Sequence, residues 1–434
     1  MMGSVVLTAP PAAAFEFSLR PSLSATSYIH VDAANAYAAD FVALIGSAIQ
    51  RADVVQAAAA RWQAETAGIV SSVGAQLPKG ALYGELGVAN GGVSQKPYAY
   101  GVRVSVPLYD GYSAGYATEA QRAVADASHA AALDELAATL VDLVAAAAAI
   151  RRETETLEIR RGQYKLMQDL LSDIIKEQQA GIASKVDRDQ VESQLAQVQI
   201  DIRNSDSARL EAMASFAEIA GAAPTHVGAI GSIADLLPAD AEAGLAVALK
   251  ENPQLAQRLG LADAARLSTR SLASSLGPAL SLDLSAGVEG DLDNAIREAT
   301  DLRAVFKLEV PLAFGTEGAV RKSAHSAQAA DFELSAARKG VTAGLHGAYQ
   351  RLAIVRKNLG LAKDALDRAR SVRSGITVER TLGQRSIFDV LNAQKAFAEA
   401  QIQILRLRYD LTVAEHLLAA QLGRLDDIYG VTLR

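Results

Sequence analysis

Histidine and cysteine, the side chains most typical of metal sites and nucleophilic catalysis, are scarce in this chain. It contains six histidines, and no two of them have the spacing of a metal-binding pair. Cysteine is absent, which excludes disulfides, thiolate metal sites and cysteine nucleophiles. There is no Walker A motif and no complete dinucleotide-binding glycine motif. We therefore expect no catalytic residue, no metal site and no cofactor, and the chain is predicted not to be an enzyme.

Charge and hydropathy limit the classes of partner. Lys and Arg number 42 against 49 Asp and Glu, a formal charge of −7. A mildly acidic chain without a basic block is a poor ligand for nucleic acid, so no such partner is expected. The sequence contains no run of about 18 apolar residues, so no transmembrane helix is predicted. Residues 5–14 are apolar, but no Lys or Arg precedes them. Residues 1–30 are therefore set apart as an N-terminal segment, which could be the remnant of an export signal.

The chain repeats itself at an offset of about 200 residues. The matching segments are 104–111 (VSVPLYDG) with 308–315 (LEVPLAFG), 82–88 with 280–286, and 180–187 with 382–389. Three matches in the same order and at nearly one offset indicate an internal duplication. We predict a first structural repeat over 31–230 and a second over 231–434.

Each repeat holds two stretches in which apolar and polar residues alternate. They predict strands at about 81–90, 98–108, 279–289 and 301–312, with loops at 91–92 and 291–301 between them. A period of two gives each strand one apolar and one polar face. The apolar positions include Tyr98, Tyr100, Val102, Val104, Leu280, Leu282, Leu284, Leu302, Phe306 and Leu308.

Long proline-free stretches predict very long helices on either side of two turns. The expected helices beside the turns are 112–180, 186–221, 316–382 and 387–423, and the turns are 181–185 and 383–386. A further helix is expected over 242–276. A helix over 112–180 would be a rod of about 100 Å. Apolar residues at heptad spacing predict coiled-coil packing, with an ordinary bundle core as the alternative. The many alanines would let neighbouring helices approach closely.

The alternating strands pose a problem of closure. Four strands are too few for a barrel, since the smallest membrane barrels have about eight. Their apolar face could pack on a second layer in a soluble sandwich, or it could contact lipid. Lipid tolerates no unpaired backbone, so several chains would then have to close one barrel around a polar interior. The flanking rods favour the lipid interpretation.

The order of elements and the motifs resemble the TolC-like outer-membrane factors, the exit ducts of tripartite efflux and type I secretion systems. The resemblance spans about 32–425 and rests on the paired Val-Pro-Leu strand ends, the helix start at 251–255 (ENPQL) and the two turns. Residues 382–394 (LGQRSIFDVLNAQ) are most similar to the type I secretion branch.

The resemblance implies an α+β membrane protein and a homotrimer. A long α-helical coiled-coil barrel would continue into a trimeric 12-stranded transmembrane β-barrel, to which each chain gives four β-strands, and the alternating apolar face would contact outer-membrane lipid. The protein would lie in the outer membrane of a Gram-negative bacterium and extend into the periplasm.

The resemblance also implies a docking function for the two turns. They would dock a periplasmic adaptor (membrane fusion) protein, which joins the duct to an inner-membrane transporter that is either an ABC or a proton-driven pump. The docking residues would be Gly181, Ile182, Ala183, Ser184, Leu382, Gly383, Gln384, Arg385 and Ser386. Glycine also fits the left-handed cap that ends each long helix at these turns.

A periplasmic gate is expected at the same turns. Arg385 would link to Asp187, and Asp389 would stand in a ring at the constriction. Where the family has a second aspartate ring this chain has Asn392, which removes that ring's charge. For Asp389 an alternative stays open, namely an aspartate that stabilises the N-terminus of its own helix.

Two functional alternatives also stay open. A soluble coiled-coil scaffold of the cell interior is the alternative from another class, supported by the poor N-terminal signal. Within the channel class, multidrug efflux competes with type I protein secretion, which the second turn favours.

Overall fold

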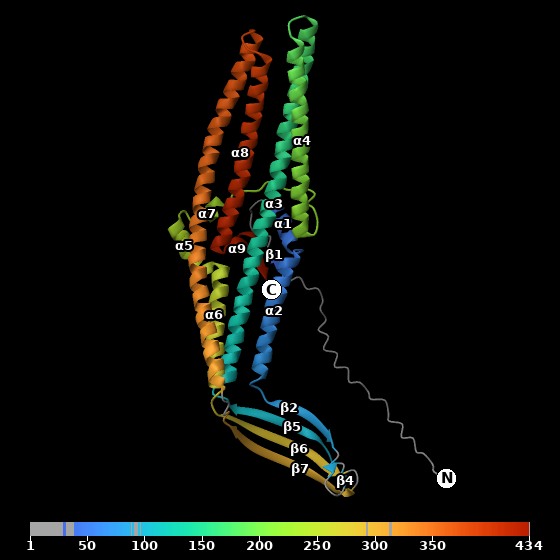
Figure 1. Cartoon of the computed structure of the whole chain (residues 1–434), viewed down its shortest axis with the longest axis vertical. Helices are drawn as coiled ribbons and strands as arrows, with labels where there is room; N and C mark the ends of the chain where they lie inside the picture. The colour runs from blue at the N-terminus through green and yellow to red at the C-terminus, as the bar shows by residue number, and fades with distance from the viewer. Residues whose placement is uncertain are drawn as a thin grey trace, which may run out of the picture.

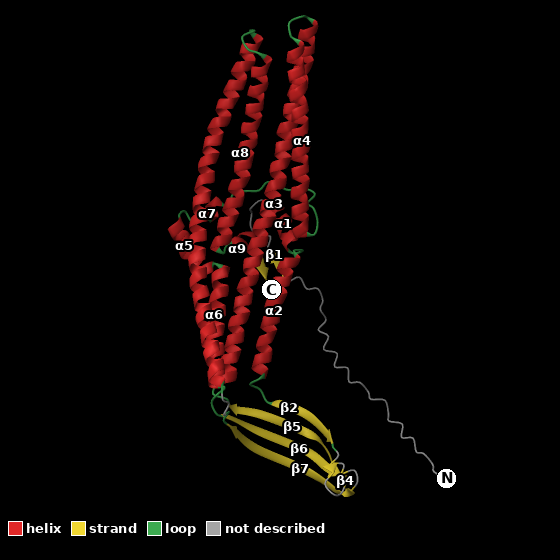
Figure 2. Cartoon of the chain, in the orientation of Figure 1, coloured by secondary structure: helices red, strands yellow, loops and turns green. Residues whose placement is uncertain are grey.

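The computed structural model describes residues 29–31, 39–87, 89–90, 94–95, 97–291, 294–311 and 315–433. Long helical rods stand on one end of a curved four-stranded sheet (Figures 1 and 2). Most of the N-terminal segment 1–30, the loop expected at 91–92 and the last residue of the strand expected at 301–312 lie outside the described residues.

Two helical hairpins extend away from the sheet (Figure 1). The first joins α3 (Ser113–Gln179) to α4 (Lys185–Ala220), and the second joins α7 (Thr316–Thr381) to α8 (Ile387–Leu422). The remaining helices are α1 (Ala39–Ile49), α2 (Asp53–Gly74), α5 (Ala241–Glu251), α6 (Pro253–Ser274), α9 (Leu425–Tyr429) and a 3-10 turn, η1 (Ala234–Leu236). None of the described helices has a stretch apolar enough to cross a membrane.

The two hairpins match each other in length. The long helices α3 and α7 have 67 and 66 residues, and the returning helices α4 and α8 have 36 each. Each long helix follows a pair of long strands that is itself preceded by a helix of 22 residues, α2 or α6. The same sequence of elements therefore occurs once in each expected repeat.

The single helix expected over 242–276 is wrong, because the chain breaks between α5 and α6. Asn252 has an extended backbone, and its side chain accepts a hydrogen bond from the backbone N–H of Leu255 at 3.1 Å. Pro253 follows at the first helical position, where its missing N–H costs nothing. A capping residue followed by proline starts a new helix.

The sheet has the antiparallel order β2-β5-β6-β7. Its strands are β2 (Lys79–Leu86), β5 (Pro97–Tyr109), β6 (Ala279–Asp291) and β7 (Asn294–Glu309). Short strands β3 (Ala89–Asn90) and β4 (Ser94–Gln95) pair beyond the end of β2. The loop expected at 291–301 is wrong: Asp291 pairs with Asn294, and β7 runs on through it. Polar side chains there do not interrupt the strand, because pairing uses the backbone.

Small residues and a central core hold the rods together. A Cβ placed on Gly260 of α6 would lie 2.9 Å from the Cβ of Ala127 on α3, so these helices touch almost backbone to backbone. Midway along the rods, Phe41, Leu140 and Phe216 are buried in one apolar cluster that also includes Tyr429. Beside it β1 (Ile29–Val31) pairs with β8 (Val431–Leu433), a contact between the chain's ends that the sequence did not reveal.

Candidate functional site at the helical tips and the sheet

The two tips share one local structure. Gly181 and Gly383 have φ angles of 75° and 72°, in the left-handed region that glycine adopts without a Cβ clash. The residue after each glycine donates its N–H back into the last turn, Ile182 to Glu177 at 2.8 Å and Gln384 to Glu379 at 2.9 Å. These bonds satisfy helix-end carbonyls and fix where the chain reverses.

Each tip continues into a reciprocal capping box. Ser184 and Ser386 accept hydrogen bonds from the backbone N–H groups of Asp187 and Asp389, whose carboxylates accept from the same serines in return. The backbone and hydroxyl groups of Ser184 lower the pKa of Asp187, and those of Ser386, the hydroxyl first, lower the pKa of Asp389. Hydrogen bonds to the charged form favour ionisation. For Asp389 the structure thus contains the helix-terminal role that the sequence left open.

The expected partners Arg385 and Asp187 do not pair within one chain. The Arg385 side chain donates to Glu379 at 2.6 Å, inside its own tip, and this contact raises the pKa of Arg385. Asp187 is held by Ser184. The link between Arg385 and Asp187 stays a prediction.

A different arginine joins the two hairpins. Arg380 at the end of α7 donates to Glu177 at the end of α3 at 2.8 Å. An alignment of the two tips could have indicated this ion pair. At an offset of about 202 residues, Glu177 corresponds to Glu379 and Ala183 corresponds to Arg385. Arg385 pairs with Glu379 in the second tip, but Ala183 at the matching position of the first tip has no charge. The carboxylate of Glu177 is therefore left to pair with Arg380.

Below the tips an apolar cluster packs the hairpins together. Met167 and Ile174 of α3, Val191 of α4, and Ile387 and Val390 of α8 are all buried in it.

At the surface, Ile182, Leu382 and Phe388 are exposed. A groove of about 400 Å³ between α4 and α8 is lined by Val186, Asp189, Phe388 and Asn392 among others, so the structure places Asn392 at this groove.

The sheet register gathers the expected apolar positions on one face. Val102 stands opposite Ala286 and Ala286 opposite Leu302, while Leu280 and Leu282 stand opposite Leu308 and Phe306. Directly paired residues share a face, and alternate residues along a strand keep to it. Leu302 and Phe306 are 84% and 70% exposed in the single chain. Such a continuous apolar surface marks a contact with another protein or with a membrane.

One sequence motif of hydrolases occurs in the chain, and its serine contacts a neighbouring helix. Residues 111–115 read Gly-Tyr-Ser-Ala-Gly, the pattern of a nucleophile elbow. Ser113 begins α3, and its hydroxyl donates to the backbone carbonyl of Ser271 on α6 at 2.9 Å. Among the described residues no histidine bonds to it. Ser113 therefore joins two helices above the sheet.

Comparison with known proteins agrees with this architecture. A model of the family "outer membrane efflux protein" matches residues 245–424. Outer membrane efflux protein BepC of Brucella suis is 24% identical over 52% of this chain and 53% of its own length. Alkaline protease secretion protein AprF of Pseudomonas aeruginosa is 25% identical over 63% of this chain and 59% of its own length. The chain thus spans little more than half the length of these curated relatives.

Solved structures extend the likeness to the whole fold. The channel protein CusC superimposes with a TM-score of 0.79 at 16% identity, over 88% of this chain and 92% of its own. VceC, an outer membrane protein of Vibrio cholerae, does so with a TM-score of 0.77 at 14% identity, over 89% and 96%. Residues 245–424 thus match the outer membrane efflux protein family, and the chain as a whole has the fold of solved outer-membrane channel proteins.

Proposed function

We propose that this protein is the outer-membrane exit duct of a tripartite export system, a passive homotrimeric channel gated at its periplasmic tips. The observation that carries the proposal is the curved sheet, which has one continuous apolar face and two outer strands, β2 and β7, that each pair on one side only among the described residues.

Closure of the sheet supports a trimer. Unpaired strand edges are not tolerated in lipid, so the β2 edge of one copy would pair with the β7 edge of the next. Three copies of the four-stranded sheet would make the 12-stranded barrel that the resemblance implies. The helices offer a matching surface, because Phe332, Ile354 and Leu361 along α7 are exposed in the single chain and would pack on a neighbouring copy.

The equal hairpins support an internal duplication. The lengths of the long and returning helices agree within a residue between the repeats, and the same turn closes both tips. A duplicated unit would also explain how three chains surround a lumen with six similar hairpins.

The gate would lie at the tips. Opening would swing the α7–α8 hairpin away from α3–α4, which would break the ion pair between Arg380 and Glu177. A partly exposed pair holds a conformation weakly, by about 0–1 kcal/mol, but it would occur in all three copies. Arg385, Asp187 and Asp389 would add contacts between copies when the ring is shut.

The tips would also dock the periplasmic adaptor. Exposed Ile182, Leu382 and Phe388 offer apolar contacts beside the groove between α4 and α8. The channel has no energy source of its own under this proposal, so transport would be driven by an inner-membrane transporter joined through the adaptor. That transporter would be an ABC or a proton-driven pump.

For the cargo we favour type I protein secretion. The support is the second tip, 382–394, and the similarity to AprF, which is named for the secretion of alkaline protease. Multidrug efflux is the second candidate, supported by the name of BepC.

Membrane fractionation followed by reconstitution tests the proposed function. The protein should be recovered with the outer membrane, require detergent for extraction, have the mass of a trimer and form ion-conducting pores in planar bilayers. Recovery without detergent in the soluble fraction would contradict the proposal and favour the soluble coiled-coil scaffold.

A further inference from the structure

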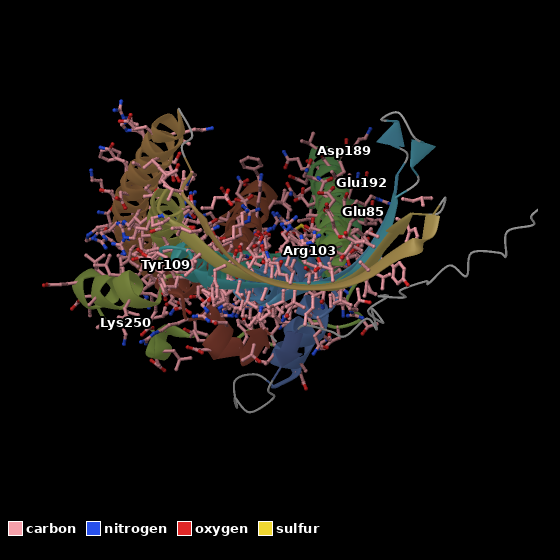
Figure 3. All side chains as sticks on the ribbon, turned by 90° about the horizontal axis from the view of Figure 1, so that it is seen from below. Glu85, Arg103, Tyr109, Asp189, Glu192 and Lys250 are labelled. Carbon is pink, nitrogen blue, oxygen red and sulfur yellow. The ribbon has the colours of Figure 1, made fainter. Side chains whose placement is uncertain are left out.

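The polar face of the sheet carries its charges at defined levels. Cross-strand pairing aligns Arg103, Ser285 and Arg303 at one level, and it aligns Glu85, Ala99 and Glu289 at another. The second level lies four residues farther from the helices. Figure 3 shows the curved sheet with Arg103 and Glu85 on its concave side. These side chains therefore face whatever space the sheet encloses.

Several of the charges on this face are neutralised locally. Arg303 pairs with Asp301 at 2.6 Å, and Lys307 pairs with Glu309 at 2.7 Å. The carboxylate of Asp283, near the helices, accepts a hydrogen bond from the Ser105 hydroxyl at 2.6 Å, which leaves its negative charge in place.

Two cations near the helices are left without an ionic partner. Neither Lys79 nor Arg103 forms an ion pair with any side chain in the described part of the chain. Lys79 on β2 stands opposite Ser105 of β5, which is two residues nearer the helices than Arg103 on the same strand. Strand spacing of about 4.8 Å and a rise of about 3.3 Å per residue put these two positions about 8 Å apart. They form one positive patch on adjacent strands.

The guanidinium of Arg103 is held in place by an aromatic ring. It lies over Tyr83, 4.9 Å from the ring centroid. Tyr83 in turn lies across Gly287, where a Cβ would come within 2.5 Å of the tyrosine hydroxyl. Glycine at this position makes room for the ring, and a cation over an aromatic face is stabilised without losing its charge.

Opposite charges lie nearer the end of the sheet that is farther from the helices. Glu85 and Glu289 have no ion-pair partner among the described side chains either. Four residues separate their level from Arg103, which corresponds to about 13 Å along the strand. That distance is slightly longer than the Debye length of about 10 Å at 0.1 M salt, so the two levels do not cancel each other.

We propose that Lys79 and Arg103 form a basic belt inside the barrel that sets its charge selectivity by favouring anions at the half nearest the helices. The inference rests on the proposed function, because only closure of the sheet turns its concave face into a channel wall. Three copies of the pair would then surround the path, with the carboxylates of Glu85 and Glu289 at the outer mouth.

Reversal potentials across planar bilayers test the belt. In a KCl gradient around 0.1 M, the double variant Lys79→Gln/Arg103→Gln should raise the permeability of K⁺ relative to Cl⁻ by about twofold or more. The difference should disappear near 1 M KCl, where the screening length is only about 3 Å. Triphosphate added on the helix side should reduce the current through the unmodified channel more than through the variant.

Two matched variants control for structure and for charge that is already paired. Asp301→Asn/Arg303→Gln removes an ion pair from the same wall without changing net charge and should leave the selectivity unchanged. Arg103→Lys keeps the charge but not the planar stacking on Tyr83, and it should also retain the selectivity.

The outcomes separate the belt from the duct. Pores with unaltered selectivity in the Lys79→Gln/Arg103→Gln variant, or an equal shift in the Asp301→Asn/Arg303→Gln variant, would overturn the belt and leave the proposed function intact. If the unmodified protein forms no pore, the proposed function fails and the belt fails with it.

Discussion

At the tips, some charged side chains form contacts within one hairpin, and one forms a contact between the two hairpins. Asp187 and Asp389 are committed to capping boxes with Ser184 and Ser386. Arg385 is committed to Glu379 within its own tip. Arg380 is different, because it reaches Glu177 on the other hairpin. It is therefore the residue whose removal should loosen the contact between the two hairpins.

Removal of the Arg380 side-chain charge should raise conductance. We expect Arg380→Gln to increase the open probability or single-channel conductance in planar bilayers, because it breaks the ion pair with Glu177 while leaving the capping boxes intact. The charge-reversed double variant Glu177→Arg/Arg380→Glu should return the channel towards its closed level.

Arg385→Ser is the matched comparison, since it removes an arginine from the same tip. The gate expected from the sequence, a link between Arg385 and Asp187, predicts that Arg385→Ser also raises conductance. A rise with Arg385→Ser and none with Arg380→Gln would support that link and contradict a gating role for Arg380.

A buried histidine makes stability depend on pH. His416 is fully buried, with its ring nitrogens bonded to the Thr412 carbonyl at 2.7 Å and the Tyr429 hydroxyl at 2.9 Å. Burial lowers its pKa from 6.5 to about 4. Between these values the unfolded chain binds a proton that the folded chain does not, so stability is full above pH 6.5 and falls as the pH drops towards 4.

The expected loss is about 3 kcal/mol over that range if the pKa difference is fully expressed. Thermal melting of the detergent-solubilised protein should show it, and His416→Gln should make the melting temperature less dependent on pH in this window. His226→Gln, at an exposed histidine, is the control. An equal pH dependence in the wild type and His416→Gln would rule out His416 as the cause.

Among the elements, helix ends and strand registers do most of the positioning. Gly423 ends α8 with φ 76°, and a Cβ there would lie 2.2 Å from the backbone oxygen of Glu251. On the other side of that contact, Arg424 pairs with Glu251 at 2.8 Å. The end of α8 is thus fitted closely to the junction between α5 and α6.

Substitution at Gly423 should therefore be costly. We expect Gly423→Ala to lower the stability by more than about 1 kcal/mol, because both the left-handed φ and a backbone atom oppose the added methyl group. Gly360→Ala is the matched control: Gly360 lies within α7, and a Cβ there would meet nothing within 4 Å, so the change should stabilise by up to about 1 kcal/mol. Equal melting temperatures for Gly423→Ala and the wild type would contradict the close fit.

Many of the helices and strands can be predicted from the sequence. Strict alternation at Leu280, Leu282 and Leu284 reveals a strand, because its period matches the pleat. The same logic failed after Asp291, where polar residues continue a strand whose pairing is made by the backbone. The helix start at Asn252 was visible in the motif at 251–255, but the helix expected over 242–276 ran across it, because periodicity alone does not include the rule for a cap followed by proline.

The tip contacts were harder to predict for a physical reason. Glycines 181 and 383 mark the turns, since their backbone conformation is local. The pairing of Arg380 with Glu177 joins residues about 200 positions apart and depends on how two helices are rotated about their axes. Only the comparison of the two repeats, with Ala183 in place of Arg385, offered a hint of it.

On the scale of the whole molecule, the single chain leaves two kinds of surface open. In the part of the chain that the structure describes, the outer edges of the sheet at β2 and β7 are unpaired, and its convex apolar face is exposed. Along α7 a line of apolar side chains, including Ile354 and Leu361, is exposed as well. Assembly of three copies around one axis would cover the edges and the helix line, and lipid would cover the face.

Disulfide trapping between the two edges tests this closure most directly, because the natural chain contains no cysteine. Leu82→Cys on β2 is combined in turn with a cysteine at Leu302, Ala304, Phe306 or Leu308 on β7, so that no register between copies is assumed. Within one chain the edges are three strand spacings apart, about 14 Å, too far for a disulfide. We predict that at least one oxidised pair gives covalent dimers and trimers in native membranes, while each single-cysteine variant stays monomeric on a denaturing gel. Only monomers from every pair would contradict closure of the sheet between copies.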